Sequence, residues 1–177
     1  MKLIKSLLAV SLLAGSLFAA DYAFAPNRGK VGFTINHRAL GVVEGRFDKF
    51  DGTISIDGGK VTALKGTVDV VSISTDNTKR DDHLRNEDFF DEPKFPKITF
   101  ASTLASANTI AGNLTIHGIT KPVTLNVKRD IESGKTGDNY LITGKIKRSD
   151  FDIGDSFTTN VQLGDDVTIN LSIRPPL

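Results

Sequence analysis

The side chains that could perform metal or acid–base chemistry in this chain are few, and they are not grouped. His37, His83 and His117 lie far apart in the sequence, and none belongs to an HxH or HExxH motif, the spacings that bring two imidazoles to one metal ion. Cysteine is absent, which excludes a thiolate nucleophile, a thiolate metal site and a disulfide framework. We therefore expect no catalytic residue, no metal and no cofactor.

One segment, KRDDHLRNEDFFDEPKFPKITF (residues 79–100), is an exception because its charges are dense. Arg80 and Arg85 carry guanidinium groups, which bind phosphate and carboxylate well, and His83 lies between them. These three residues are the candidates for contact with the head group of a ligand. The alternative is structural: Arg80, Asp81 and Arg85 would form ion pairs within the segment, and His83 would hydrogen-bond a helix to the rest of the protein.

The same segment also carries large apolar residues, which a solvated run of charges does not need. They are Leu84, Phe89, Phe90 and Phe95. Side-chain oxygens at residues 75–78 and at Asn86 can cap two short helices, and Pro93 and Pro96 end the second. A long ordered connection over a β-structure is usually a binding loop or a cover. A helix that plugs a barrel as ordinary core is the alternative.

Outside this segment, apolar and polar residues alternate, which predicts half-buried β-strands. The alternating stretches are residues 31–35, 54–56, 64–70, 98–104, 110–116, 123–127, 142–146 and 167–173. Most connections are short, so neighbouring strands should be antiparallel hairpins. The sequence therefore predicts an all-β protein, an antiparallel barrel of eight or more strands.

The phase of the alternation identifies residues that should face inward. Phe33, Val68, Phe100, Leu114, Leu125 and Ile169 share this phase on six strands, and Ile35 continues it. Phe47 and Phe50 have opposite parity, which predicts a bulge or bend near residues 48–49. Small residues also fall in the inward phase, at Gly66, Ser102, Gly112 and Gly144. They either leave a cavity or accommodate neighbouring aromatic rings, and the pattern fits both.

Alternation alone does not tell whether the apolar face points into a barrel or out into lipid. An outer-membrane barrel should carry aromatic girdles, but tryptophan is absent and tyrosine occurs only at positions 22 and 140. A barrel with an apolar interior is favoured, and the membrane barrel remains the alternative. The net charge is close to neutral, which gives no reason to expect a nucleic-acid partner or an anionic membrane.

The first twenty residues have the pattern of a secretory signal peptide. Lys2 and Lys5 precede an apolar run at residues 7–17, and small residues follow at Ala19 and Ala20. The run is too short for a transmembrane helix, and no later segment is long and apolar enough to span as one. We expect a signal peptide at residues 1–20, one domain at residues 21–177, and a periplasmic or secreted protein.

Several motifs occur in order along the chain: VGFTINH, GRFDKFDG, SISTDNTKRDDHLRNEDFFD with FPKITF after it, NLTIHGITKPVTL and the closing VTINLSI. They resemble the motifs of the YceI-like family of exported lipid-binding proteins. The resemblance covers the whole domain, with Asn86 where many members carry serine. It implies a lipocalin-like barrel with an apolar pore and one or two short helices near its opening. It also implies that Leu84, Phe89 and Phe90 face the pore.

The expected function is therefore binding, without catalysis, of a long-chain amphiphile such as a polyisoprenoid or a fatty-acid amide. Phe33, Ile35, Phe47, Phe50, Val68, Leu84, Phe89, Phe90, Phe100, Leu114, Leu125 and Ile169 are the predicted ligand-binding residues. A bound lipid is expected in place of a cofactor, and edge contacts would allow a homodimer. An enzyme acting on a lipid is an alternative.

Overall fold

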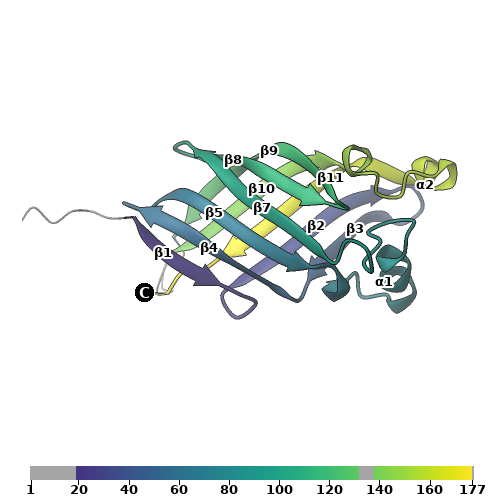
Figure 1. Ribbon diagram of the computed structural model, residues 1–177, viewed down its shortest axis with the longest axis horizontal. Coiled ribbons are helices and arrows are strands. Elements are labelled where there is room, and N and C mark those ends of the chain that lie inside the picture. Colours follow the sequence, from purple (N-terminus) through teal and green to yellow (C-terminus); the bar gives the residue numbers. More distant parts are fainter. Residues whose placement is uncertain (1–18, 132–137, 177) are drawn as a thin grey trace, which may run out of the picture.

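The predicted alternation produces a single antiparallel sheet in the computed structural model, which describes residues 19–131 and 138–176 (Figure 1). Within these ranges it contains eleven strands: β1 (Ala20–Phe24), β2 (Gly29–His37), β3 (Gly41–Phe47), β4 (Phe50–Asp57), β5 (Lys60–Asp69), β6 (Ile73–Ser74), β7 (Lys97–Ala105), β8 (Thr109–Ile116), β9 (Ile119–Asp130), β10 (Asn139–Lys147) and β11 (Leu163–Ile173). The helical elements are η1 (Val70–Ser72), α1 (Thr78–Arg85), η2 (Arg148–Phe151) and α2 (Phe157–Gln162). The prediction of an all-β antiparallel fold with short helices is confirmed.

The sheet curls on itself because two short connections join strands from opposite ends of the strand order. The strand order is β1-β4-β5-β7-β8-β9-β10-β11-β2-β3-β6. The chain bends at Asp48 and Lys49 to pass directly from β3 into β4, and η1 joins β5 to β6. Both connections therefore bring the two ends of the strand order together. Phe47 and Phe50 flank the bend and are both buried, which confirms the bend that their parity predicted.

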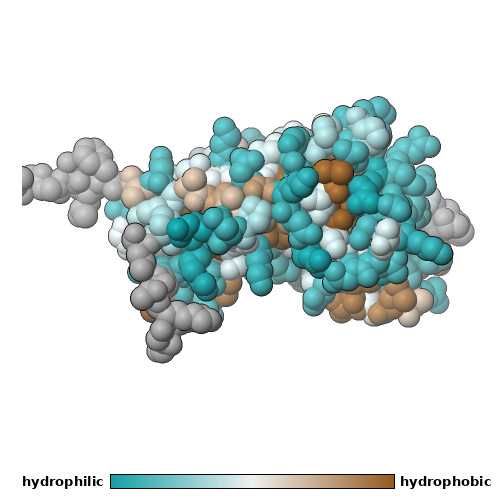
Figure 2. All heavy atoms as spheres, turned by 90° about the horizontal axis from the view of Figure 1, so that it is seen from below, coloured by the Kyte–Doolittle hydropathy of each residue, from teal (hydrophilic) through white to brown (hydrophobic). Residues whose placement is uncertain are grey.

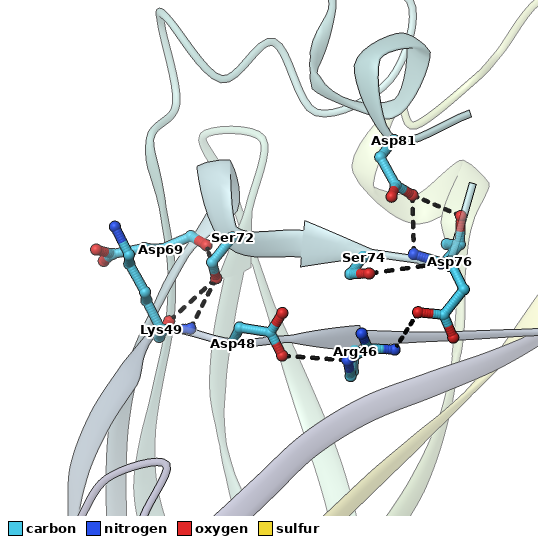
Figure 3. A network of polar contacts seen from close by, with 9 residues as sticks. Arg46, Asp48, Lys49, Asp69, Ser72, Ser74, Asp76 and Asp81 are labelled. Atoms are coloured by element: carbon cyan, nitrogen blue, oxygen red, sulfur yellow. Dashed lines mark hydrogen bonds and ion pairs between the residues drawn. The ribbon is translucent and has the colours of Figure 1, made fainter. Parts of the chain in front are cut away.

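Hydrogen bonds across the bend replace the ladder that is interrupted there (Figure 3). The N–H of Asp48 donates to the carbonyl of Ser72 (3.1 Å), and the N–H of Asp69 donates to the carbonyl of Lys49 (3.0 Å). The N–H of Lys49 donates to Oγ of Ser72 at 2.9 Å. Buried or partly buried backbone groups cost free energy when they lack a partner, so Ser72 is a structural residue of this corner.

The inward side chains form two apolar clusters along the length of the curled sheet. The first lies away from the helices and includes Phe24, Ile54, Ile110, Tyr140 and Ile142. The second lies at the end that carries α1 and α2 (Figure 1) and consists of Phe89, Leu114, Ile116, Phe151 and Ile153. The first cluster therefore closes one end of the structure with strand residues alone, whereas the helical connections contribute to the second.

Two of the small inward residues, Gly112 and Gly144, accommodate large neighbours. A Cβ on Gly112 would lie 2.6 Å from Cζ of Phe100, and a Cβ on Gly144 would lie 2.4 Å from Cδ2 of Leu125. Ser102 accepts a hydrogen bond from the N–H of Leu64 through its Oγ, at 3.0 Å. Gly66 instead faces an interior cavity, and a Cβ there would lie 3.5 Å from the nearest atom.

Two expectations from the sequence were wrong in detail. The alternation over residues 98–104 predicts that Leu104 faces inward like Phe100, but Leu104 is exposed, because the register of β7 against β8 shifts between Ser102 and Leu104. A second helix was expected after Asn86, where the chain instead forms turns, with the N–H of Phe89 donating to the carbonyl of Asn86 (3.2 Å). The second α-helix at this end is α2, in the connection between β10 and β11.

Most of the predicted signal peptide, residues 1–18, lies outside the described residues. Among the residues that the structure does describe, no helix is long and apolar enough to cross a membrane.

Candidate functional site

A cavity of about 440 Å³ lies inside the curled sheet. Its wall includes members of the first apolar cluster, such as Phe24 and Leu64, and members of the second, such as Ile116 and Ile153. Along β11 the wall extends from Leu163 to Leu171, which corresponds to roughly 26 Å of extended strand. The cavity is therefore long, and it runs between the strand-closed end and the helix end.

All of the residues predicted from the sequence to bind a ligand line this cavity. They are Phe33, Ile35, Phe47, Phe50, Val68, Leu84, Phe89, Phe90, Phe100, Leu114, Leu125 and Ile169. Nine of them come from strands β2, β3, β4, β5, β7, β8, β9 and β11, and three come from the connection between β6 and β7. The structure thus brings together residues that are spread over most of the chain.

Sequence reasoning missed a second group of lining residues, in the connection between β10 and β11. Ile153, Thr159, Gln162 and Leu163 contact the cavity from this connection and its junction with β11. Strand residues in the inward phase were also left out, namely Val31, Val43, Val123, Ile146, Val167 and Leu171. The alternation already indicated the strand residues, whereas no periodic pattern marks the connection.

Phe89 and Phe90 cover the helix end of the cavity in different ways. The ring of Phe90 meets Phe47 edge-on, with centroids 6.2 Å apart. The ring of Phe89 packs against His83, with centroids 4.9 Å apart, and fills the space over Gly154, where a Cβ would lie 2.8 Å from its Cε1. Because Gly154 lies in the β10–β11 connection, the two connections hold each other across the end of the cavity.

Helix α1 is anchored through Thr75, a buried polar residue that precedes it. Its N–H (2.8 Å) and Oγ1 (2.5 Å) donate to Oδ1 of Asp81, which is also buried. Nε and Nη2 of Arg80 donate to Oγ1 and to the carbonyl of Thr75, both at 2.7 Å. Figure 3 shows Asp81 directed toward the strand end from above. This closed network supports the structural interpretation of Arg80 and Asp81.

The three head-group candidates have different positions. Arg80 and His83 line the cavity, and His83 also lies with Nε2 3.6 Å from Oδ2 of Asp88. Arg85 is not among the lining residues. It donates to the carboxylate of Asp82 and to the carbonyl of Val71 instead. Of the three candidates, Arg80 and His83 have the position that contact with a ligand requires.

Arg148 is a buried cation in the cavity wall, at a position that the sequence pattern predicts to be a turn. Its Nη1 donates to the carbonyls of Ile153 (2.9 Å) and Gly154 (2.8 Å), and its Nε donates to the carbonyl of Gly164 (3.1 Å). These bonds tie the first part of the β10–β11 connection and the start of β11 to the residue that follows β10. Arg148 therefore stabilises the part of the wall that no strand provides.

Shifted pKa values occur outside the cavity wall and have local causes. Burial raises the pKa of Tyr140 at the strand-closed end, and the charge of Asp138 adds to this effect. Burial also acts to raise the pKa of Asp165, but hydrogen bonds from the N–H and Oγ of Ser149 outweigh it and lower this pKa. The hydrogen bond and charge of Asp76 raise the pKa of Arg46.

Within residues 19–131 and 138–176, no three His, Cys, Asp or Glu side chains lie in positions that could hold a metal ion. His37 accepts from the N–H of Ala39 (3.1 Å), and the ring of His117 packs against Phe95, with centroids 4.7 Å apart. Each histidine therefore has a separate environment.

Comparison with known proteins identifies relatives across most of the chain. The family model of the YceI-like domain matches residues 22–174. Protein YceI from Escherichia coli O6:H1 is 39% identical over 153 residues, which cover 79% of this chain and 80% of that protein.

Solved structures share the fold. BcnA from Burkholderia cenocepacia superposes with a TM-score of 0.74 at 26% identity, covering 84% of this chain and 96% of that one. A polyisoprenoid-binding domain from Saccharophagus degradans, implicated in plant cell wall breakdown, superposes with a TM-score of 0.63 over 89% of this chain and 99% of that one. Its 17% identity establishes likeness of fold alone.

Proposed function

The chain belongs to the YceI-like family, and we propose that it is an exported, non-enzymatic carrier that holds one long-chain amphiphile in its cavity. A polyisoprenoid or a fatty-acid amide has the required character, a long apolar chain with a small polar end. The periplasm is the proposed compartment, on the basis of the basic and apolar leader sequence.

The observation that carries this proposal is the long cavity, whose wall consists mainly of apolar side chains from ten strands and two connections. Its volume of about 440 Å³ lies within the range of small-molecule sites. Burying about ten methylenes of a ligand would yield roughly 8 kcal/mol before the costs of immobilisation. Micromolar binding therefore needs no ionic anchor.

The polar lining residues favour one orientation of the ligand. Asp51 and Thr67 line the cavity from β4 and β5, but a larger group of polar residues contacts it from the helical connections: Thr75, Arg80, His83, Thr159 and Gln162. The opposite end is closed by apolar residues such as Phe24 and Leu64. An amphiphile would lose fewer hydrogen bonds to water with its polar end among the helices. We propose that the apolar tail points toward the strand-closed end.

The likeness to the Saccharophagus degradans domain supports the ligand class, because that protein is a polyisoprenoid-binding domain of the same fold. The outer faces of the strands also fit a carrier in water: Thr124, Asn126 and Lys128 of β9 are exposed. An outer-membrane barrel would present apolar residues at such positions.

Native mass spectrometry of the purified protein, followed by organic extraction, tests the proposal. A co-purified amphiphile that is released intact, one per chain, is the expected result. A chemically altered lipid that accumulates with time would indicate an enzyme instead. A protein that stays in solution only with detergent would indicate a membrane barrel. Amino-terminal sequencing of the periplasmic fraction tests export, and we expect the chain to begin near Asp21.

A further inference from the structure

The turn between β2 and β3 and the neighbouring α2 expose large apolar side chains. Leu40 is 60% exposed, Val42 is 63% exposed and Val161 is 48% exposed. The two elements are joined by a hydrogen bond from the N–H of Arg38 to the carbonyl of Gln162, at 2.8 Å. Figure 2 shows apolar side chains gathered on the surface toward the end that carries the helices. We call the surface formed by Leu40, Val42, Val161 and Arg38 the apolar rim.

The apolar rim is continuous with the cavity. A groove between the β2–β3 turn and α2 is lined by Arg38, Val42 and Val161. Three further residues, His37, Gln162 and Leu163, line both this groove and the cavity. An amphiphile that entered or left between these elements would pass directly along the rim.

The charge of the groove is complementary to phosphate. None of the described residues that line it is Asp or Glu, and its charged side chain is Arg38. Arg38 is exposed and forms no ion pair with a described carboxylate. A guanidinium binds phosphate well, and apolar side chains beside basic ones are typical of surfaces that lie in a membrane interface. The α1 side is mixed in charge and on balance acidic, because residues 78–94 contain six Asp or Glu against four Lys or Arg.

We propose that the apolar rim docks on the phosphate-bearing surface of a lipid bilayer. Leu40, Val42 and Val161 enter the boundary between head groups and acyl chains, and Arg38 binds lipid phosphate. The cavity then faces the membrane, and the amphiphile moves between bilayer and cavity without crossing water. This inference rests on the proposed function, because it assigns the surface through which the carrier is loaded and unloaded.

Co-sedimentation with vesicles of phosphatidylethanolamine and a minority of phosphatidylglycerol tests docking. The rim variant is Leu40→Asp with Val42→Asp, and Arg38→Gln tests the phosphate contact. The matched control is Leu104→Asp, because Leu104 is 67% exposed on β7 at the opposite end of the structure. A fluorescent prenyl probe, added from dilute solution without vesicles, measures cavity binding separately.

We expect the rim variant to bind vesicles on the order of tenfold more weakly and to exchange the probe with vesicles correspondingly more slowly. It should bind the dissolved probe as the wild type does, and Leu104→Asp should match the wild type throughout. Docking is refuted if wild-type protein does not sediment with vesicles, or if the rim variant sediments equally. It is also refuted if the wild type is a dimer, the rim variant is a monomer and both bind vesicles equally well, since the rim would then bind a second copy of the chain. Failure of wild type to bind dissolved probe contradicts the proposed function alone.

Discussion

The ring of Phe33 lies across Gly45 on the neighbouring strand, in the space that a side chain at position 45 would need. The two residues are direct partners in the register of β2 and β3. A Cβ at position 45 would lie 2.2 Å from Cζ and 2.5 Å from Cε1 of the ring. Phe33 also packs on Phe47, with ring centroids 5.9 Å apart. The absence of a side chain at position 45 therefore determines where the cavity wall lies.

Replacing Gly45 by Ala should displace the Phe33 ring. Overpacking of this kind costs about 1–3 kcal/mol of stability, and the displaced ring should also reduce the affinity for a dissolved prenyl probe. Thermal unfolding and probe titration measure the two effects. Gly66→Ala is the matched control, because its Cβ would lie 3.5 Å from the nearest atom. Equal stability of the two variants would show that Phe33 can move freely.

Replacing Leu114 by Asp should remove ligand binding. Leu114 is buried and lines the cavity, and an unpaired carboxylate in an apolar wall costs several kcal/mol unless it is protonated. Chemical denaturation and lipid extraction measure stability and occupancy. The neighbouring Asn113 is exposed, so Asn113→Asp adds the same charge without burying it. A Leu114→Asp variant that folds and retains lipid as Asn113→Asp does would mean that ligand binds elsewhere.

The strands could be predicted from the sequence because one face of each strand is buried. Burial of that face requires an apolar residue at every second position, and this is the alternation that the sequence shows. The prediction failed at Leu104, where the register shift after Ser102 turns the side chain outward. A shift of one position reverses the direction of every later side chain. Nothing in a periodic pattern indicates whether such a shift is present.

The strand part of the cavity was predictable for the same reason, since a curled sheet brings its inward residues together. The part formed by Ile153 and Leu163 was not. Their connection is held by Arg148 and by the bond from the N–H of Gly154 to the carbonyl of Asp88, at 2.9 Å. These contacts join segments that are far apart in sequence, so no local pattern records them. Arg85 was a reasonable head-group candidate by residue type, but its partners turn it away from the cavity.

The stability contributed by Asp165 should depend on pH. Its pKa lies below the ordinary 3.8 because Ser149 donates two hydrogen bonds to the carboxylate. Because the pKa is lower in the folded state, the ionised carboxylate stabilises the fold at any pH above its pKa in the unfolded state, which is about 3.9. This contribution is lost as the pH falls through the pKa of the folded state. At neutral pH, Asp165→Asn should cost about 1 kcal/mol.

Denaturation of wild type and Asp165→Asn between neutral pH and pH 3 checks this dependence. The difference in unfolding free energy between the two proteins should shrink below about pH 4. Asp166→Asn serves as the control, because Asp166 is the exposed neighbour. A difference that stays constant down to pH 3 would contradict the role assigned to Ser149.

The last prediction distinguishes a lid from a core at Phe89 and Phe90. Both rings line the cavity, and Phe89 is also a buried member of the second apolar cluster. If ligand supplies part of their burial, Phe89→Ala with Phe90→Ala should release lipid faster and lose much of the stabilisation that added lipid provides, because this stabilisation follows affinity. If the rings are ordinary core, each truncation should cost about 3–5 kcal/mol with or without lipid.

Thermal unfolding of the double variant with and without added lipid separates the two cases. Phe95→Ala is the control within the same segment, because Phe95 packs on His117 and over Gly118 and is not among the lining residues. It should lower stability while leaving the lipid-induced shift unchanged. We expect the double variant to lose most of that shift, since these rings are held in a connection rather than by strand pairing. A full shift together with a large loss of stability without lipid would assign both rings to the core.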